Sequence, residues 1–316
     1  MYFGRISIGV IWNKPLIHSE PVTDGTEASL QAENSTFMGA EPEPSKPANK
    51  NNELMVRLVA GLIMAPLGIW VVLMGGFWLA AATAVCAVFA ALEWSRMVSM
   101  KADKKAGLVF PASLVLLAGI SILIAHYGFG YLAIYSLIGA LLISIAAILM
   151  KRSAISYGFG ALYVSFPFGA FVLIRNEWTE GGVFLILVMG LVWTTDIAAF
   201  LAGKGFGGPR FSPNNSPNKT WTGVLGAMFC TIVAGLALSR FTDHSLIHFG
   251  VFAGVISIVA QFGDLMESWW KRQFGVKDTS GVIPGHGGVL DRLDSLMATV
   301  SVLTVCDALI PALRLS

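Results

Sequence analysis

The sequence has few charged residues: lysine, arginine, aspartate and glutamate make up 13% of its 316 residues. A soluble domain has about a quarter. The hydrophobic share is 55%, and the mean hydropathy is +0.70. These values exclude an ordinary soluble enzyme and predict an all-α, polytopic integral membrane protein.

Cysteine is also scarce, and Cys86, Cys230 and Cys306 all lie in apolar segments. They have neither pairing nor zinc-ligand spacing, so we interpret them as small hydrophobic residues without a redox role. No strand is expected before the glycines of 203–208, which match G-x-G-x-x-G. The missing strand excludes a dinucleotide site of the Rossmann kind.

Apolar segments of about 20 residues follow one another from Arg57 onward, and this length matches a hydrocarbon core of about 30 Å. We expect about nine transmembrane helices. They are predicted at residues 57–75, 77–94, 107–126, 130–150, 156–175, 182–203, 221–239, 246–268 and 293–312. Only Gly75 and Gly76 separate the first two, which predicts either a tight hairpin or one re-entrant unit there.

The region before these segments has a different composition. Residues 1–53 include many Pro, Glu, Asn, Ser and Thr and lack helical periodicity, which predicts a disordered cytoplasmic tail. The rest is predicted to comprise N-terminal transmembrane helices over 54–180 and a C-terminal catalytic transmembrane region over 181–316.

The positive charges are unevenly distributed between the two sides of the predicted membrane. All lysines and arginines except Arg175, Arg240 and Arg314 fall on the side of the tail. The positive-inside rule places that side in the cytoplasm. We therefore expect a multi-pass protein of a cell membrane, with the bacterial inner membrane as its location and the active site facing the cytoplasm.

One stretch, residues 264–294, concentrates the scarce charges. Its charged or titratable residues are Asp264, Glu267, Lys271, Arg272, Lys277, Asp278, His286, Asp291, Arg292 and Asp294. Carboxylates suit hard divalent cations, whereas lysine and arginine suit phosphate. The combination predicts a metal-bridged phosphate site, as in phosphoryl or nucleotidyl transfer.

Helical spacing groups the acids of this stretch. Asp264, Glu267 and Ser268 share one helix face, and Asp291 and Asp294 lie three residues apart at the start of the last span. Two helix ends are thus expected to bring carboxylates to one region at the membrane boundary. An alternative for Asp291 is a purely structural role at a helix N-terminus.

A second long loop, residues 204–220, ends in Ser216-Pro217-Asn218-Lys219-Thr220. We expect Ser216 to cap the following helix and Lys219 to reach a phosphate; a plain capping turn is the alternative. Asp196 lies inside the sixth predicted span, where an acid is a functional candidate by default; a hydrogen-bonded structural acid is the alternative.

Plainer interpretations remain open for several other residues. Lys271, Arg272 and Lys277 are alternatively juxtamembrane charges that set topology. His286 is either an acid–base or phosphate-binding group or only a turn residue. Glu93 and Asp307, near span ends, are assigned to the membrane interface.

With these residues in hand, a family resemblance emerges. It rests on Ser268-x2-Lys271-Arg272-x4-Lys277-Asp278-x-Ser280-x2-Ile283-Pro284-x-His286-Gly287-Gly288-Val289-x-Asp291-Arg292-Leu293-Asp294. This pattern resembles the signature of the phosphatidate cytidylyltransferase (CDP-diglyceride synthase) family. Asp196 and the Ser216–Trp221 segment also resemble that family. Trp270 and Thr222 depart from its pattern.

The resemblance implies an activity: CTP and phosphatidic acid give CDP-diacylglycerol and pyrophosphate. It implies Mg²⁺, with a second monovalent or divalent cation, held by Asp264 and Asp291 with support from Asp278 and Asp294. The expected catalytic residues are Asp264, Asp291, Asp294, Lys271 and Arg272. The expected substrate-binding residues are Ser216, Lys219, Thr220, Ser268, Lys277, His286 and Arg292.

Predicted partners are CTP, phosphatidic acid and membrane lipids, without nucleic acid; a homodimer is left open. One competing class is an ion-coupled transporter using Asp196 and Asp264, although most of the charge falls in loops rather than at mid-bilayer. A second is another CTP-using lipid enzyme, such as a polyprenol kinase. The pattern of a CDP-alcohol phosphotransferase is absent.

Overall fold

The computed structural model describes residues 50–101, 108–178, 180–241, 245–282 and 287–309. The helices in this part of the chain are α2 (Lys50–Met74), α3 (Gly76–Lys101), α4 (Val109–Ile124), α5 (Phe129–Leu149), α6 (Ala154–Glu177), α7 (Gly181–Phe206), α8 (Trp221–Leu238), α9 (Leu246–Gln273) and α10 (Leu290–Leu309). The prediction of an all-α protein is confirmed. Residues 1–49 of the predicted tail lie outside the described residues, and α2 begins at Lys50.

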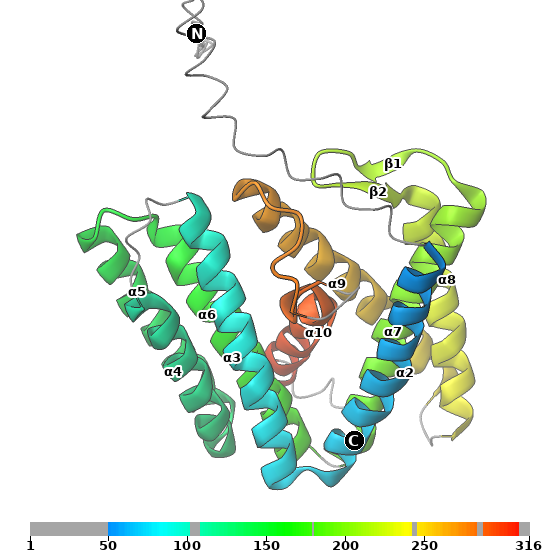
Figure 1. The fold of residues 1–316 in the computed structure, drawn as a ribbon. Coiled ribbons are helices and arrows are strands. Elements are labelled where there is room, and N and C mark those ends of the chain that lie inside the picture. Colours follow the sequence, from blue (N-terminus) through cyan, green and yellow to red (C-terminus); the bar gives the residue numbers. More distant parts are fainter. Residues whose placement is uncertain (1–49, 102–107, 179, 242–244, 283–286, 310–316) are drawn as a thin grey trace, which may run out of the picture. The chain divides into compact units, whose positions relative to one another are not determined.

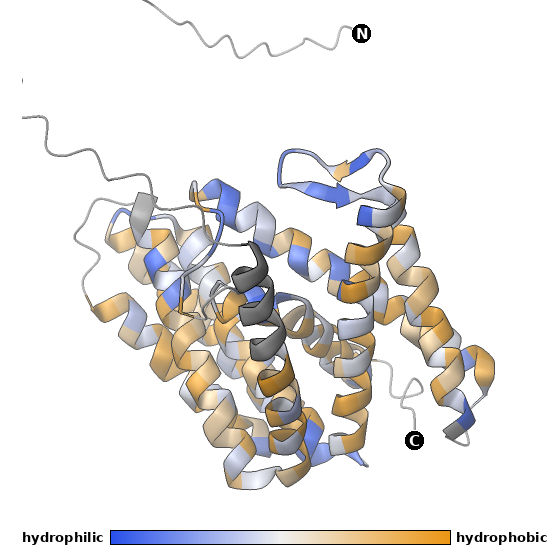
Figure 2. Ribbon diagram, turned by 45° about the vertical axis from the view of Figure 1, so that its right-hand side comes forward, coloured by the Kyte–Doolittle hydropathy of each residue, from blue (hydrophilic) through white to orange (hydrophobic). Residues whose placement is uncertain are grey.

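Seven helices of the described part, α3 to α9, are long and apolar enough to cross a membrane. In α2 the apolar part that is described, Gly61–Met74, is shorter, and α10 carries Asp291, Arg292, Asp294 and Asp307. The predicted spans therefore all coincide with helices, although the strongest membrane-crossing character belongs to seven. Figure 2 shows hydrophobic residues along the long helices and hydrophilic ones around the strands.

The helix α6 occupies the centre of the fold. It packs against α3, α4, α5, α7 and α10, while α9 packs against α7, α8 and α10. Figure 1 shows α3 to α6 side by side, with α9 and α10 between this group and the group of α2, α7 and α8. The two last helices, which carry the charged stretch, therefore lie between helices from earlier parts of the chain.

The expected tight connection at Gly75 and Gly76 is present, but α2 and α3 diverge from it into the two groups of helices seen in Figure 1 and do not pack along their length as a hairpin. Both glycines have positive φ, +62° and +48°, a conformation that side-chain-bearing residues rarely adopt. Arg175 of α6 closes the end of α2: its Nε donates to the carbonyl oxygen of Val72 at 2.8 Å, and its Nη2 donates to that of Leu73 at 3.3 Å. These bonds satisfy carbonyls that lack a partner within the helix.

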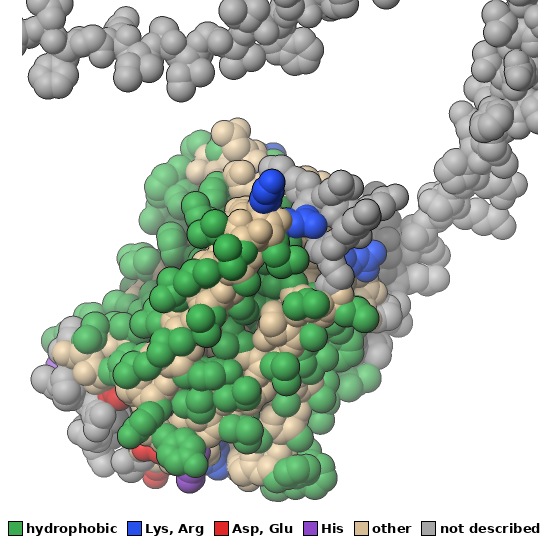
Figure 3. All heavy atoms as spheres, turned by 90° about the vertical axis from the view of Figure 1, so that its left-hand side faces the viewer, with side chains coloured by type: hydrophobic (Ala, Val, Ile, Leu, Met, Phe, Trp, Pro, Cys, Tyr) green, Lys and Arg blue, Asp and Glu red, His purple; other side chains and the backbone are tan. Residues whose placement is uncertain are grey.

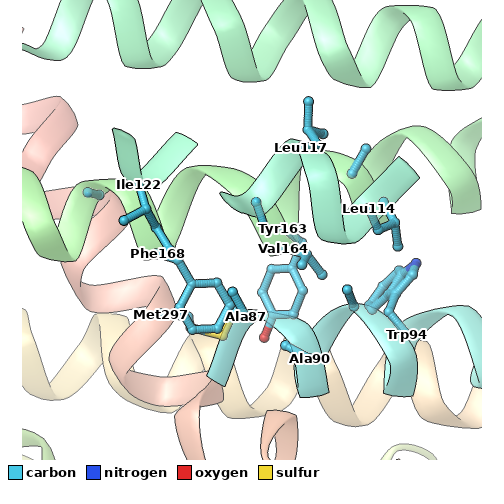
Figure 4. Packing of buried hydrophobic residues seen from close by; sticks show 14 of the residues in the cluster. Ala87, Ala90, Trp94, Leu114, Leu117, Ile122, Tyr163, Val164, Phe168 and Met297 are labelled. Carbon is cyan, nitrogen blue, oxygen red and sulfur yellow. The ribbon is translucent and has the colours of Figure 1, made fainter. Parts of the chain in front are cut away.

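An aromatic cluster joins α3, α6 and α9. Trp94 is fully buried, and its ring centroid lies 5.6 Å from that of Tyr163 and 5.6 Å from that of Trp270. Figure 4 shows Trp94 and Tyr163 among the buried apolar side chains of neighbouring helices. This packing fixes the C-terminal half of α9 against the N-terminal helices.

A short antiparallel hairpin, β1 (Arg210–Ser212) and β2 (Ser216–Thr220), precedes α8. It lies at the same end of the bundle as the C-terminal end of α9 (Figure 1). The face shown in Figure 3 is largely hydrophobic, and Lys and Arg side chains gather at its upper end. This separation of apolar surface and positive charge fits a protein that spans a membrane.

Candidate active site

The charged stretch is built on the crossing of α9 and α10. A Cβ atom on Gly263 would lie only 2.8 Å from the carbonyl oxygen of Asp294 and 2.5 Å from Cβ of Ala298, so only glycine permits this close approach. Asp264, next to Gly263, and Asp294 lie within electrostatic range of each other. The structure thus brings the predicted carboxylates of two helix ends together.

Lys271 lies at the centre of a buried ion-pair network. Its Nζ lies 2.8 Å from Oδ1 of Asp291 and 3.2 Å from Oε1 of Glu267. Glu267 is fully buried and also accepts a hydrogen bond from the hydroxyl of Tyr163 at 3.3 Å. Because Lys271 is only 9% exposed, its positive charge is compensated by these two acids rather than by water.

Asp291 has both oxygens engaged by protein donors. Besides Lys271 on Oδ1, its Oδ2 accepts from the backbone N–H of Gly288 at 2.8 Å. The same oxygen accepts from the N–H and the hydroxyl of Thr279, both at 3.0 Å. Asp291 therefore holds the segment before α10 against α9.

Glu93 of α3 is a component that sequence reasoning missed. Its assignment to the membrane interface is wrong, because the side chain is buried, with 3% exposure. Its carboxylate accepts four hydrogen bonds from the segment between α9 and α10. The donors are the hydroxyl of Ser280 at 2.6 Å, the backbone N–H groups of Val289 and Leu290, both at 2.9 Å, and the hydroxyl of Thr279 at 3.1 Å, whose single proton is shared with Asp291.

Gly288 makes this arrangement sterically feasible. A Cβ atom at this position would lie 2.0 Å from Oγ1 of Thr279 and 2.6 Å from Oε2 of Glu93. Any side chain would push apart two elements that the hydrogen bonds hold together. Gly288 thus serves close packing, and its N–H donates to Asp291.

Asp264 belongs to a second, more open ion pair. Its Oδ2 lies 2.6 Å from Nζ of Lys219, and the two side chains are 34% and 24% exposed. Ser268, one turn later on α9, donates its hydroxyl to Oδ1 of Asp264 at 3.3 Å. Asp196 of α7 is within electrostatic range of Asp264 and Lys219. The expected proximity of Ser268 to Asp264 is therefore present, whereas the pairing of Lys219 with Asp264 was not predicted.

The hairpin supplies Lys219 and is tied to α9. Arg272 donates its Nε–H to the carbonyl oxygen of Asn215, between the strands, at 3.1 Å. The prediction that Ser216 caps the next helix is wrong, because Ser216 begins β2 and Thr220 is the N-cap. Thr220 accepts from the N–H of Gly223 at 3.1 Å. Residues 204–220, which were predicted to form a loop, thus contain two short strands.

The remaining candidate site residues lie at the surface or outside the described part of the structure. Lys277, Asp278 and Arg292 are exposed. His286 lies outside the described residues, as do Ile283 and Pro284. The roles predicted for these side chains in substrate binding, and for Asp278 in metal binding, stay predictions.

Within the described ranges, no group of three His, Cys, Asp or Glu side chains is arranged to hold a metal ion. Mg²⁺ usually retains water and takes only one or two carboxylates together with substrate phosphates. Asp264, partly exposed and adjacent to the hydroxyl of Ser268, offers oxygen donors of that kind. The donor chemistry therefore fits Mg²⁺, whereas Asp291 would have to exchange a protein donor to bind it.

Together, fold and site define a class: a multi-pass membrane protein with a frame of buried ion pairs and a partly open lysine–aspartate pair beside it. A family model described as the cytidylyltransferase family matches residues 55–309. The chain belongs to this family.

Two curated relatives illustrate the similarity. The phosphatidate cytidylyltransferase of Brucella suis biovar 1 is 32% identical over 262 residues, which cover 82% of this chain and 94% of that protein. The phosphatidate cytidylyltransferase of Staphylococcus aureus strain COL is 31% identical over 260 residues, covering 80% and 98%. The family predicted from the motif of residues 268–294 is confirmed.

Proposed function

We propose that this protein transfers CMP from CTP to phosphatidic acid, giving CDP-diacylglycerol and pyrophosphate. The observation that carries the proposal is the Lys219–Asp264 pair, which is open beside the buried network of Lys271 in a chain of the cytidylyltransferase family. The relatives named above are phosphatidate cytidylyltransferases, and their similarity extends over most of the chain.

The reaction needs positioning and charge compensation more than proton transfer. A phosphate oxygen of the lipid attacks the α-phosphorus of CTP, and the bond from that phosphorus to the pyrophosphate oxygen breaks. The attacking phosphate is already anionic, so no strong base is required. Lys219 and its partner Asp264 are both partly exposed. Lys219 is therefore suited to contact a substrate phosphate.

Asp264 is the carboxylate we assign to Mg²⁺ binding, with Asp291 and Asp278 as the further ligands predicted from the sequence. When bound, Mg²⁺ would offset the repulsion between the two anionic substrates. The buried ion pairs of Lys271 keep α9 and the start of α10 in place, so that Asp264 is held at a fixed position. Lys271 thus helps to position Asp264, whereas Lys219 binds a substrate phosphate.

The location of the site follows from the distribution of positive charge. We infer that the end with β1, β2 and the C-terminus of α9 faces the cytoplasm, because CTP is a water-soluble nucleotide and lysines and arginines favour that side. The acyl chains of phosphatidic acid would remain in the bilayer, between helices α7 to α10. A bacterial inner membrane and a homodimer stay predictions.

The test uses purified full-length protein in detergent with phosphatidic acid, Mg²⁺ and CTP labelled at either the α- or the γ-phosphate. Label from the α-position is expected in the lipid product, and label from the γ-position in pyrophosphate. Transfer of the γ-label to lipid would instead identify a lipid kinase. No lipid labelling from either position, with protein that remains monodisperse, would refute both.

A further inference from the structure

A cavity of about 720 Å³ lies on another side of α9. Its walls come from the end of α3, the α5–α6 connection, the first turn of α6 and the end of α9. The volume falls in the range of small-molecule pockets, about 300–1,000 Å³. None of the residues assigned to the reaction above lines this cavity.

The last turns of α9 separate the cavity from the candidate active site. Trp269, Trp270 and Gln273 line the cavity, whereas Asp264 and Lys271 form ion pairs away from it. Trp270 is 7% exposed, and its ring stacks on those of Phe159 and Phe274, at 4.9 and 5.9 Å between centroids. A molecule in the cavity is thus kept from the reacting groups by a packed aromatic layer.

The polar part of the cavity favours an anion. Lys151 and Arg152 line it, followed by Ser153, the N-cap of α6, and no acidic residue is among the lining residues that the structure describes. Lys151 has a φ of +55° at the end of α5, a position that glycine or asparagine normally takes. The turn thus carries a cation at some conformational cost.

Tyr157 supplies a second observation that points to a ligand. It lines the cavity, is only 5% exposed, and its hydroxyl has no hydrogen-bond partner among the described residues. A buried hydroxyl without a partner costs free energy, so a ligand atom that accepts its hydrogen bond would be stabilised.

The apolar part of the cavity opens toward lipid. Met150, Ile155 and Trp269 line it and are 56%, 76% and 41% exposed. Tryptophan favours the headgroup level of membranes, and the adjoining helices α3, α5, α6 and α9 are apolar enough to span. The cavity therefore offers cations at headgroup level and an apolar exit into the acyl region.

We propose that this cavity binds an anionic phospholipid of the surrounding bilayer, with its phosphodiester at Lys151, Arg152 and Tyr157. This lipid is distinct from the reacting one, because the aromatic layer around Trp270 separates the two places. Bound there, it stabilises the junction of α3, α6 and α9. The inference does not depend on the proposed function.

The experiment is a titration of delipidated full-length protein in detergent with phosphatidylglycerol, followed by native mass spectrometry. Replacing both cations, Lys151→Gly with Arg152→Gln, should weaken binding about 30-fold, from about 1 kcal/mol per juxtamembrane cation. Glycine is chosen because it accepts the φ of position 151. Lys204→Gln, an exposed lysine at the end of α7 outside the cavity, is the matched control and should bind normally.

A smaller change guards against a variant that fails to fold. Tyr157→Phe keeps the ring against Phe110, 4.1 Å away between centroids, and removes only the hydroxyl. It should weaken binding about tenfold, as expected for one hydrogen bond to a charged group. Unchanged affinity in this variant, or equal affinity for phosphatidylcholine, overturns the proposal. Selective binding of phosphatidic acid over phosphatidylglycerol also overturns it, in favour of a store for the reacting lipid.

Discussion

Two lysine–carboxylate centres share helix α9, the first with α10 and the second with β2, and they differ in exposure and in hydrogen bonding. Lys271 is buried between Glu267 and Asp291, and Asp291 has both oxygens filled by protein donors. The pair of Lys219 and Asp264 is partly exposed. A buried pair is costly to break, whereas an exposed pair exchanges partners readily. The first centre therefore stabilises the packing of α9 against the start of α10, and the second is available to substrates.

The largest effect is expected from Asp291→Asn. The change leaves the charge of Lys271 inadequately compensated in a buried place, which costs about 3–5 kcal/mol. Both turnover and thermal stability in detergent should collapse. Retention of the wild-type unfolding temperature would show that the buried centre does not hold the frame.

Asp264→Asn should separate activity from stability. We expect kcat to fall about 10²–10³-fold, as when one preorganised charge-stabilising group is lost from an active site. The unfolding temperature should stay close to that of the wild type, because the pair of Asp264 is partly exposed. Activity assays and thermal unfolding on the same preparation measure both. A parallel loss of stability would erase the contrast between the centres.

Glu93→Gln should loosen the frame from the side of α3. An amide cannot accept all four hydrogen bonds that the carboxylate receives, and each buried donor left unsatisfied costs about 1–3 kcal/mol. Amide hydrogen exchange at Val289 and Leu290 should accelerate. Glu177→Gln, an exposed acid at the end of α6, provides the control and should leave that exchange unchanged.

Lys219→Ala should affect substrate binding with little effect on folding. Stability should change by less than about 1 kcal/mol, as for partly exposed ion pairs. The KM for CTP or phosphatidic acid should rise about tenfold, the loss of one charged hydrogen bond. Steady-state kinetics give both constants, and Lys219→Arg should recover most of the affinity. A fall in kcat alone, with unchanged KM, would move Lys219 from binding to the chemical step.

The smallest effect concerns the helix that follows the hairpin. Thr220→Ala removes the N-cap bond to Gly223 and should destabilise the protein by about 1 kcal/mol. Thr220→Ser keeps the bond and should be close to neutral. Ser216→Ala should also be neutral in unfolding experiments, and an effect as large as that of Thr220→Ala would restore the cap to Ser216.

Local patterns in the sequence predicted most of the architecture. Apolar runs of sufficient length mark each helix, and the positive φ values of Gly75 and Gly76 match the expected break between the first two. The grouping of Asp264 with Ser268 also follows from helical spacing. The strands escaped prediction because they are short and lie in a segment rich in Gly, Pro and Asn.

The contribution of α3 was not predicted, for a physical reason. Glu93 and its donors are 186 to 197 residues apart in the chain, and periodicity informs only on neighbours along a helix. One signal was available: an acid within an apolar run is a functional or structural candidate by default. That rule was applied to Asp196 and would have selected Glu93 as well. The pairing of Lys219 with Asp264 likewise depends on tertiary folding.

The bonds of Glu93 bear on how this protein tolerates being divided. A fragment starting at residue 181 would contain the whole motif of residues 268–294 but would lack both Glu93 and Tyr163. Its backbone donors at Val289 and Leu290 would face lipid or an empty space, where unsatisfied groups are costly. Co-expressed halves should therefore regain function only by associating in the membrane, and the C-terminal half alone should be degraded.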